Sequence, residues 1–255
     1  MDETKTGEAT KAGGNNWSVP IAIVLAGVMI AGALYFKTPA PTGGQVAAVG
    51  DLNKMAKISA SDHTRGSLKA PIKIVEYSDL ECPFCKAFDG AMKQVLTKHN
   101  ATSTSVAWIY RHFPLDSIHS KARKEAEAVE CAYEQTGNDG FWKFTDKIFS
   151  VTPSNNGLDL ALLPAFAKEL GLDEAKFNTC LTSGKMAEKI EANYQNGIAI
   201  GVDGTPTVIV VMENGKMFMP FKEKVPTKAT EQVKTLTADI FTLYQDEITK
   251  LRGNN

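Results

Sequence analysis

PIKIVEYSDLECPFC, residues 71–85, is the stretch of the 255-residue sequence that decides the fold. Its first part alternates in polarity and is rich in β-branched residues, so residues 71–77 are predicted to form a strand. Residues 82–98 follow with apolar side chains at helical spacing, which predicts a helix. Cys82 and Cys85 therefore stand where a strand gives way to a helix.

The motif Cys82-Pro83-Phe84-Cys85 suits thiol–disulfide chemistry at this junction. Unsatisfied amide groups and the positive dipole end of a helix stabilise a thiolate, so Cys82 is predicted to be the attacking cysteine. Pro83 fits the first helical position, because its missing N–H costs nothing there. Cys85 lies about one turn later and is predicted to be the resolving cysteine.

A zinc half-site and a pair of inert thiols are the two alternatives for this motif. Zinc would need two further ligands at motif spacing. The other two cysteines lie far along the chain, and the four histidines include no pair at a spacing such as H-x3-H. No metal site is therefore predicted.

Glu76, on the strand before the motif, is predicted to exchange a proton with Cys85. It shares a strand face with Ile72 and Ile74, which points it towards the core. Burial would raise its pKa and let it relay the proton of Cys85 during exchange. An exposed glutamate on an edge strand is the alternative.

Gly204-Thr205-Pro206-Thr207 precedes a second strongly apolar strand, predicted over residues 206–211. A proline is tolerated at the first residue of a strand. A cis bond there would form a sharp, fixed turn. The residues alone favour an ordinary trans turn.

The remaining elements predict an α/β domain interrupted by helices. Residues 105–110 read as a strand, and Asn214-Gly215 predicts a hairpin between residues 206–211 and 216–219. Apolar spacing and glycine punctuation predict five helices between these strands, over residues 117–135, 141–149, 158–170, 173–181 and 185–201. A final amphipathic helix is predicted over residues 227–251.

Residues 17–36, WSVPIAIVLAGVMIAGALYF, form an uncharged apolar run. As a helix the run spans ~30 Å, the thickness of a bilayer core, so a single-pass membrane anchor is predicted. A cleaved signal peptide is the first alternative, although residues 1–16 mix acidic and basic side chains. A buried core helix is the second.

The resulting organisation is a short tail (1–16), the anchor (17–36), a flexible linker (37–57) and a folded domain (58–255). The helical insertion occupies about residues 115–201 of this domain. A net charge of −1 provides no basic face for nucleic acid. Four cysteines are too few for a disulfide scaffold in a chain of this length.

Five segments resemble the DsbA-like branch of the thioredoxin superfamily, in its membrane-anchored or secreted bacterial group. They are VEYSDLECPFC (75–85), YRHFPL (110–115), AVECA (128–132), GFWKF (140–144) and GVDGTPT (201–207). The resemblance covers nearly all of residues 60–252 in the family's order. It implies a thioredoxin-like fold with a helical insertion, and the apolar run at residues 17–36 predicts one transmembrane helix ahead of it.

The resemblance also implies roles for individual residues. Thr205 and Pro206 match the family's cis-proline loop, which lies against the active-site disulfide and presents backbone to bound polypeptide. Pro83 and Phe84, between the cysteines, are assigned to the same substrate surface. Glu76 matches the buried acid of the superfamily.

Cys131 and Cys180 fall in two of the predicted insertion helices. Disulfide geometry cannot be read from a sequence. An extracytoplasmic chain with an even number of cysteines and one catalytic pair is nevertheless expected to join the other two in a structural disulfide. Two buried free thiols are the alternative.

These features predict a thiol–disulfide oxidoreductase at the cell membrane, with its catalytic domain on the periplasmic or outer side. It would pass the Cys82–Cys85 disulfide to reduced or unfolded secreted or membrane proteins. No cofactor besides this disulfide is expected, and the resemblance implies a quinone-linked membrane partner as reoxidant. The alternatives are a disulfide reductase or isomerase, and a non-catalytic anchored peptide-binding or chaperone module.

Overall fold

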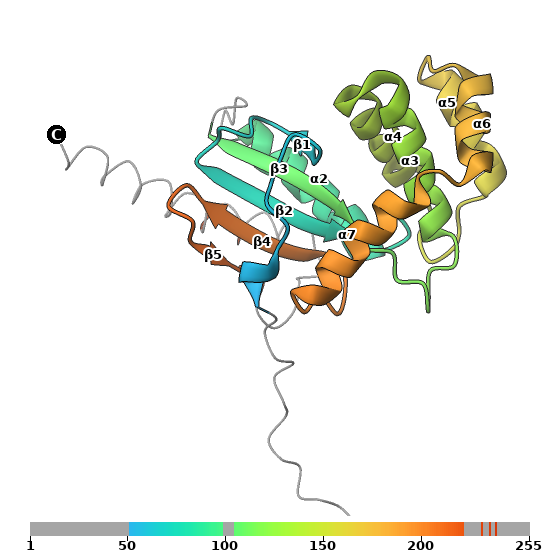
Figure 1. Ribbon diagram of the computed structural model, residues 1–255. Helices are drawn as coiled ribbons and strands as arrows, with labels where there is room; N and C mark the ends of the chain where they lie inside the picture. The colour runs from blue at the N-terminus through green and yellow to red at the C-terminus, as the bar shows by residue number, and fades with distance from the viewer. Residues whose placement is uncertain (1–50, 99–104, 222–230, 232–234, 236–237, 239–255) are drawn as a thin grey trace, which may run out of the picture. The chain divides into compact units, whose positions relative to one another are not determined.

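The computed structural model describes residues 51–98, 105–221, 231, 235 and 238 (Figure 1). These residues belong to one compact unit of the chain, residues 49–255. The predicted tail and anchor lie outside the described residues, as does nearly all of the predicted final helix. Among the described residues, no helix is both long and apolar enough to cross a bilayer.

Five strands form one sheet in the order β1-β3-β2-β4-β5 (Figure 1). They are β1 (His63–Arg65), β2 (Ile72–Ser78), β3 (Val106–His112), β4 (Thr207–Met212) and β5 (Met217–Phe218). β2 and β3 run parallel and are connected through α2 (Pro83–Lys98), whereas the other neighbours are antiparallel. β1 was not predicted, because three residues carry too little periodicity.

β2 lies at the centre of the sheet, where both of its faces are covered. Ile72 and Ile74 belong to a large apolar cluster that includes residues of α2 and of the insertion helices. Val75 and Tyr77 belong to a second cluster with Ile209. Because both faces of β2 are covered, Glu76 is buried together with the apolar residues of the strand.

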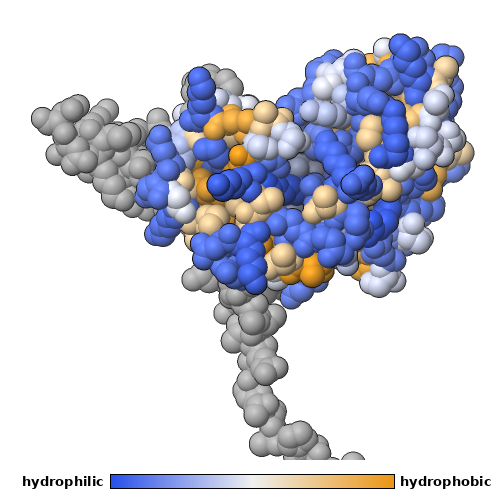
Figure 2. Space-filling view, in the orientation of Figure 1, coloured by the Kyte–Doolittle hydropathy of each residue, from blue (hydrophilic) through white to orange (hydrophobic). Residues whose placement is uncertain are grey.

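The predicted helical insertion is present between β3 and β4. It consists of α3 (Ala122–Thr136), α4 (Asn138–Val151), α5 (Leu163–Glu169), α6 (Glu174–Ser183) and α7 (Ala187–Ala199). In Figure 1, α3 to α6 form a group beside the sheet, and α7 leads from this group back towards β4. Their surface in Figure 2 is mainly hydrophilic, as expected of helices whose apolar sides face a core.

Helix ends in the insertion follow local signals in some places and tertiary contacts in others. Asp173 caps α6 by accepting a hydrogen bond from Lys176 N, and Gly137, with φ of 65°, separates α3 from α4. The prediction that α3 begins at Ser117 is wrong. Residues 117–121 form turns in which Ile118 N and His119 N both donate to the carbonyl of residue 115.

Residues 51–57, which the sequence places in the linker, are part of the folded unit. They include a short helix, η1 (Leu52–Lys54). Ala56 N donates to Asn196 Oδ1 at 3.1 Å, and Arg111 Nη2 donates to the Ala56 carbonyl at 2.9 Å. The folded unit therefore begins ahead of the predicted boundary at residue 58.

A disulfide joins two of the insertion helices. It links Cys131 of α3 to Cys180 of α6, with the two Cα atoms 5.8 Å apart. Both residues are buried within the large apolar cluster. The two cysteines of the motif are thus separate from this structural pair.

Candidate active site

Cys82 and Cys85 are free, buried thiols where α2 begins. Cys82 immediately precedes the helix, its carbonyl accepts from Lys86 N, and Pro83 is the first helical residue. The burial within the motif is uneven. Both cysteines are buried, whereas Pro83 and Phe84 between them are exposed. The face of the motif open to solvent is therefore the Pro–Phe pair.

The Thr205–Pro206 loop lies directly against Cys82. The peptide bond between these two residues is cis, so the trans turn favoured by the residues alone is wrong. In its thiol form, Cys82 Sγ donates to the Thr205 carbonyl at 3.3 Å. Thr205 is partly exposed and Pro206 is buried. The fold thus brings backbone from the start of β4 to the sulfur of the motif.

The two thiols have opposite acidities. The pKa of Cys82 is lowered to about 6, first by a hydrogen bond from the Cys85 side chain and further by the amides of Cys85 and Phe84. Burial raises the pKa of Cys85 well above its ordinary value. At neutral pH the reduced site therefore holds a thiolate on Cys82 and a thiol on Cys85.

Glu76 is almost fully buried on β2, so the exposed alternative does not apply. Trp108 Nε1 donates to Glu76 Oε2 at 2.9 Å. Burial raises the pKa of Glu76 to about 8, and its charge acts on both Cys82 and Cys85. A carboxyl with this pKa can give up or accept a proton near neutral pH.

Asp79, which the sequence analysis did not single out, holds together the loop between β2 and the motif. Its carboxylate accepts hydrogen bonds from Glu81 N at 2.8 Å and Leu115 N at 2.7 Å. His119 Nδ1 lies 2.9 Å from Asp79 Oδ2 and completes the set. Only the folded chain brings residues 115–119 to this carboxylate, so no local sequence signal identifies it.

Glu81 and Glu125 form a pair of fully buried carboxyls next to Cys82. Apart from each other, their four oxygens have no hydrogen-bond partner within the described residues. Burial, and then the interaction with Glu81, raises the pKa of Glu125 to about 10. Glu125 is therefore protonated at neutral pH and can donate to Glu81.

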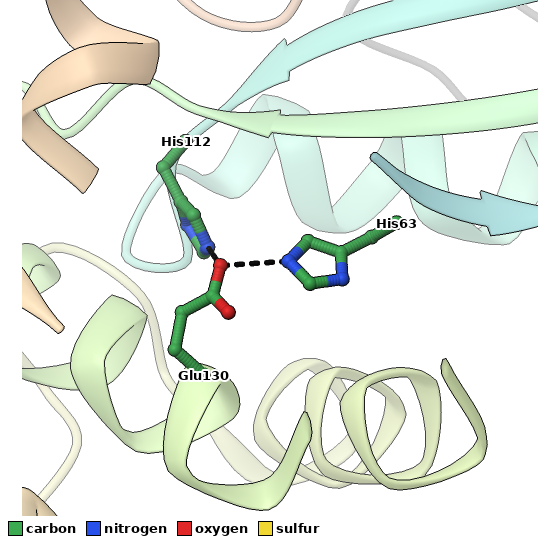
Figure 3. A group of neighbouring side chains, drawn as sticks. All are labelled: His63, His112 and Glu130. Carbon is green, nitrogen blue, oxygen red and sulfur yellow. Dashed lines mark hydrogen bonds and ion pairs between the residues drawn. The ribbon is translucent and has the colours of Figure 1, made fainter. Parts of the chain in front are cut away.

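His63, His112 and Glu130 form the group that most resembles a metal site among the described residues (Figure 3). Glu130 Oε1 lies 2.6 Å from His63 Nε2 and 3.1 Å from His112 Nε2. Lys189 Nζ donates to Glu130 Oε2 at 2.8 Å and lies 3.0 Å from His63 Nε2. Positive charge is thus already supplied to the carboxylate, which is how a buried ion network is satisfied.

The acidity of Glu130 agrees with this network. Despite burial, hydrogen bonds from His112 and His63 hold the pKa of Glu130 well below its ordinary value. No paired histidine spacing in the sequence indicates the group, because its members come from β1, β3 and α3. Their proximity is a property of the fold.

Comparisons with known proteins agree with this geometry. A family model described as Thioredoxin matches residues 59–229. Na⁺/H⁺ antiporter NhaA 3 of Salinispora tropica is 34% identical over 149 residues, 58% of this chain and 21% of that protein. NhaA 1 of Mycolicibacterium gilvum is 30% identical over 179 residues, 69% of this chain and 26% of that protein. The chain thus spans only about a fifth to a quarter of the length of these relatives.

Several solved structures with the same fold are named DsbA. DsbA2 of Pseudomonas aeruginosa is 30% identical, with a TM-score of 0.54 over 64% of this chain and 87% of that one. The α-DsbA1 protein of Wolbachia pipientis is 27% identical, with a TM-score of 0.61 over 76% and 96%. BdbD of Bacillus subtilis, at 19% identity and a TM-score of 0.58 over 78% and 97%, shares the fold. The chain therefore belongs to the thioredoxin family, in its DsbA-like branch.

Proposed function

We propose that this protein is an extracytoplasmic thiol–disulfide oxidoreductase that transfers the Cys82–Cys85 disulfide to reduced or unfolded polypeptides. The observation that carries the proposal is the unequal dithiol, in which the pKa of Cys82 is about 6 and that of Cys85 is well above its ordinary value. A stabilised thiolate on Cys82 favours the reduced form of the enzyme and hence the oxidation of its substrate.

The reaction begins when a substrate thiolate attacks Cys82 Sγ of the disulfide. The Cys82–Cys85 bond breaks, a mixed disulfide forms, and Cys85 leaves as a thiolate that takes up a proton. Glu76, with its pKa raised to about 8, can deliver that proton. A second substrate thiolate then attacks the substrate sulfur of the mixed disulfide. Cys82 leaves as a thiolate, and two electrons have passed from the substrate to the dithiol.

Substrate binding is assigned to the surface around the motif. Pro83 and Phe84 are exposed beside Cys82, and Thr205 presents its carbonyl to the sulfur. An extended polypeptide can meet the Thr205–Pro206 backbone and place its own thiolate at Cys82. Cys85 is fully buried, whereas Cys82 is 3% exposed and adjoins the exposed Pro83, so we assign the attack to Cys82.

The dithiol must be reoxidised after each turnover, and we assign this step to a quinone-linked membrane partner. A membrane anchor at residues 17–36 with the domain on the outer side would raise the effective concentration of that encounter. The Cys131–Cys180 disulfide supports such a location, because structural disulfides persist in oxidising compartments. We propose no antiporter function from the names of the relatives, because this chain spans only about a fifth to a quarter of their length.

An experiment must decide whether the protein oxidises its substrates, as proposed, or acts as a reductase or isomerase. The full chain, equilibrated with glutathione buffers, is expected to have a potential more oxidising than that of thioredoxin and to restore activity to reduced, unfolded ribonuclease. Cys82→Ser should abolish turnover. A reduction potential near that of a cytosolic reductant, with no oxidation of ribonuclease, would instead indicate a reductase or isomerase. Full function of Cys82→Ser would instead indicate a binding module.

A further inference from the structure

We infer that Asp79 and His119 form a positioning pair that fixes the two cysteines and stabilises the thiolate of Cys82. The inference rests on the proposed function and deepens it, because it names the residues that prepare the nucleophile. Neither residue belongs to the motif. Both are buried, Asp79 in the loop that follows β2 and His119 in the turns that precede α3.

The backbone of Asp79 contacts both cysteines. Its N–H donates to Cys85 Sγ at 3.4 Å, and its carbonyl accepts from Cys82 N at 3.1 Å. The same residue thus holds the start of α2 and the sulfur of the resolving cysteine. A movement of Asp79 would alter the geometry of the whole dithiol.

The side chain of Asp79 binds His119. Asp79 Oδ2 lies 2.9 Å from His119 Nδ1, and the same oxygen accepts from Leu115 N at 2.7 Å. A carboxylate bound to Nδ1 fixes the orientation of the imidazole and favours its charged form. The two side chains therefore form a buried ion pair in which the imidazolium of His119 has a fixed orientation.

A second observation, independent of this hydrogen bond, is the loop of residues 154–156. Ser154, Asn155 and Asn156 have φ values of 65°, 51° and 65°, three consecutive left-handed residues without a glycine. Asn155 N donates to the Glu81 carbonyl at 2.8 Å, and Asn156 Nδ2 donates to the Ile118 carbonyl at 2.7 Å. The loop thus connects the residue before Cys82 to the residue before His119 through two hydrogen bonds.

The charge of His119 acts on Cys82. Burial opposes a charge on His119, but the hydrogen bond with Asp79 outweighs it, so the pKa of His119 is raised, with a further contribution from Cys82. Because electrostatic coupling is mutual, the same imidazolium favours the thiolate. Glu125 and Tyr110 interact electrostatically with Asp79, and Glu81 and Lys121 in turn interact with Glu125. Glu125 is protonated at neutral pH and does not cancel the cation.

The test measures the titration of Cys82 by thiolate ultraviolet absorbance in the reduced full chain, solubilised in detergent. His119→Gln is expected to lower the acid dissociation constant of Cys82 by about tenfold, because it removes the imidazolium and leaves the Asp79 carboxylate. Asp79→Asn removes the anion and also the support for the imidazolium, so its effect on Cys82 is expected to be smaller. His112→Gln is the matched control. It removes a buried histidine that contacts Glu130 and should leave the titration of Cys82 unchanged.

A measurement on the unaltered chain covers the case in which a variant does not fold. Nuclear magnetic resonance of labelled histidine should give His119 a higher pKa in the reduced protein than in the oxidised one, because only the reduced protein carries the thiolate. Equal values in both states, or an unchanged Cys82 titration in a folded His119→Gln variant, would overturn the inference. If His119→Gln shifts the titration of Cys82 but the wild-type chain oxidises no substrate, the proposed function is refuted and this inference is retained.

Discussion

Two thiols one helical turn apart acquire different chemistry because single residues place them in different surroundings. Cys82 receives a hydrogen bond from Cys85 and amides of the first helical turn, whereas Cys85 is fully buried near Glu76. Desolvation penalises the charged form of Cys85, and donors stabilise that of Cys82. The proposed roles of Cys82 as attacking sulfur and Cys85 as resolving sulfur therefore rest on burial and hydrogen bonding.

The pH dependence of alkylation tests these roles. In the reduced protein, the rate at which iodoacetamide modifies Cys82 should rise with pH around a midpoint of about 6, because the thiolate is the nucleophile. Cys85 should remain unmodified across this range. Mass spectrometry of quenched samples measures both sites. A midpoint near the ordinary thiol value of 9.0, or equal labelling of the two cysteines, would contradict the assignment.

Glu76→Gln tests the buried acid. The pKa of Glu76 is about 8 in the folded protein and 4.5 ordinarily, so between these values the folded chain binds more protons than the unfolded chain. The stability contributed by this group is therefore complete below pH 4.5 and declines as the pH rises towards 8. Urea denaturation should show the variant losing less stability than the wild type over this interval, by on the order of 4 kcal/mol. Parallel pH profiles would refute the buried-acid assignment.

The sequence predicts the motif residues because their signals are local. Cys82 and Cys85 lie within one turn, and Glu76 is placed by strand alternation alone. Asp79, His119 and Glu125 escape such reasoning. Their roles arise only when the turns before α3 fold back on the loop after β2, a contact between distant parts of the sequence.

At the scale of elements, local signals predict which helices and strands exist, and tertiary contacts decide where some of them end. The cap at Asp173 and the glycine at position 137 set helix ends that the sequence indicates. The start of α3 is displaced from residue 117 to Ala122, because the intervening turns are bound to Asp79 and Asn156. An amphipathic pattern cannot report such contacts.

The disulfide between α3 and α6 is expected to stabilise the insertion without serving the chemistry. Cys131 and Cys180 are 49 residues apart, and closing a loop of this length is worth about 4 kcal/mol on the chain-entropy model. A Cys131→Ala/Cys180→Ala variant should unfold at a lower denaturant concentration, measured by circular dichroism. Its rate of ribonuclease oxidation under native conditions should match that of the wild type. Loss of oxidation by a fully folded variant would assign this disulfide a catalytic role.

At the scale of the whole folded unit, separate contacts attach the insertion to the sheet. The Asp79–His119 pair joins the loop after β2 to the turns before α3, and Asn196 of α7 accepts a hydrogen bond from Tyr77 of β2. The buried network of Glu130 adds strands β1 and β3 to helices α3 and α7. These ties lie on several elements, so the insertion and the sheet are expected to unfold in one cooperative transition.

Glu130→Gln tests whether the buried network holds the unit together. Removing one charge leaves Lys189 without its anion, so we expect a loss of roughly 3 kcal/mol in the free energy of unfolding, measured by urea denaturation. Glu134→Gln is the matched control, because its ion pair with Lys185 is exposed and worth less than about 1 kcal/mol. A chelator should leave the wild-type midpoint unchanged. A midpoint lowered by the chelator and restored by zinc would show that His63, His112 and Glu130 hold a metal ion, whereas equal stability of the two variants would remove the network from any structural role.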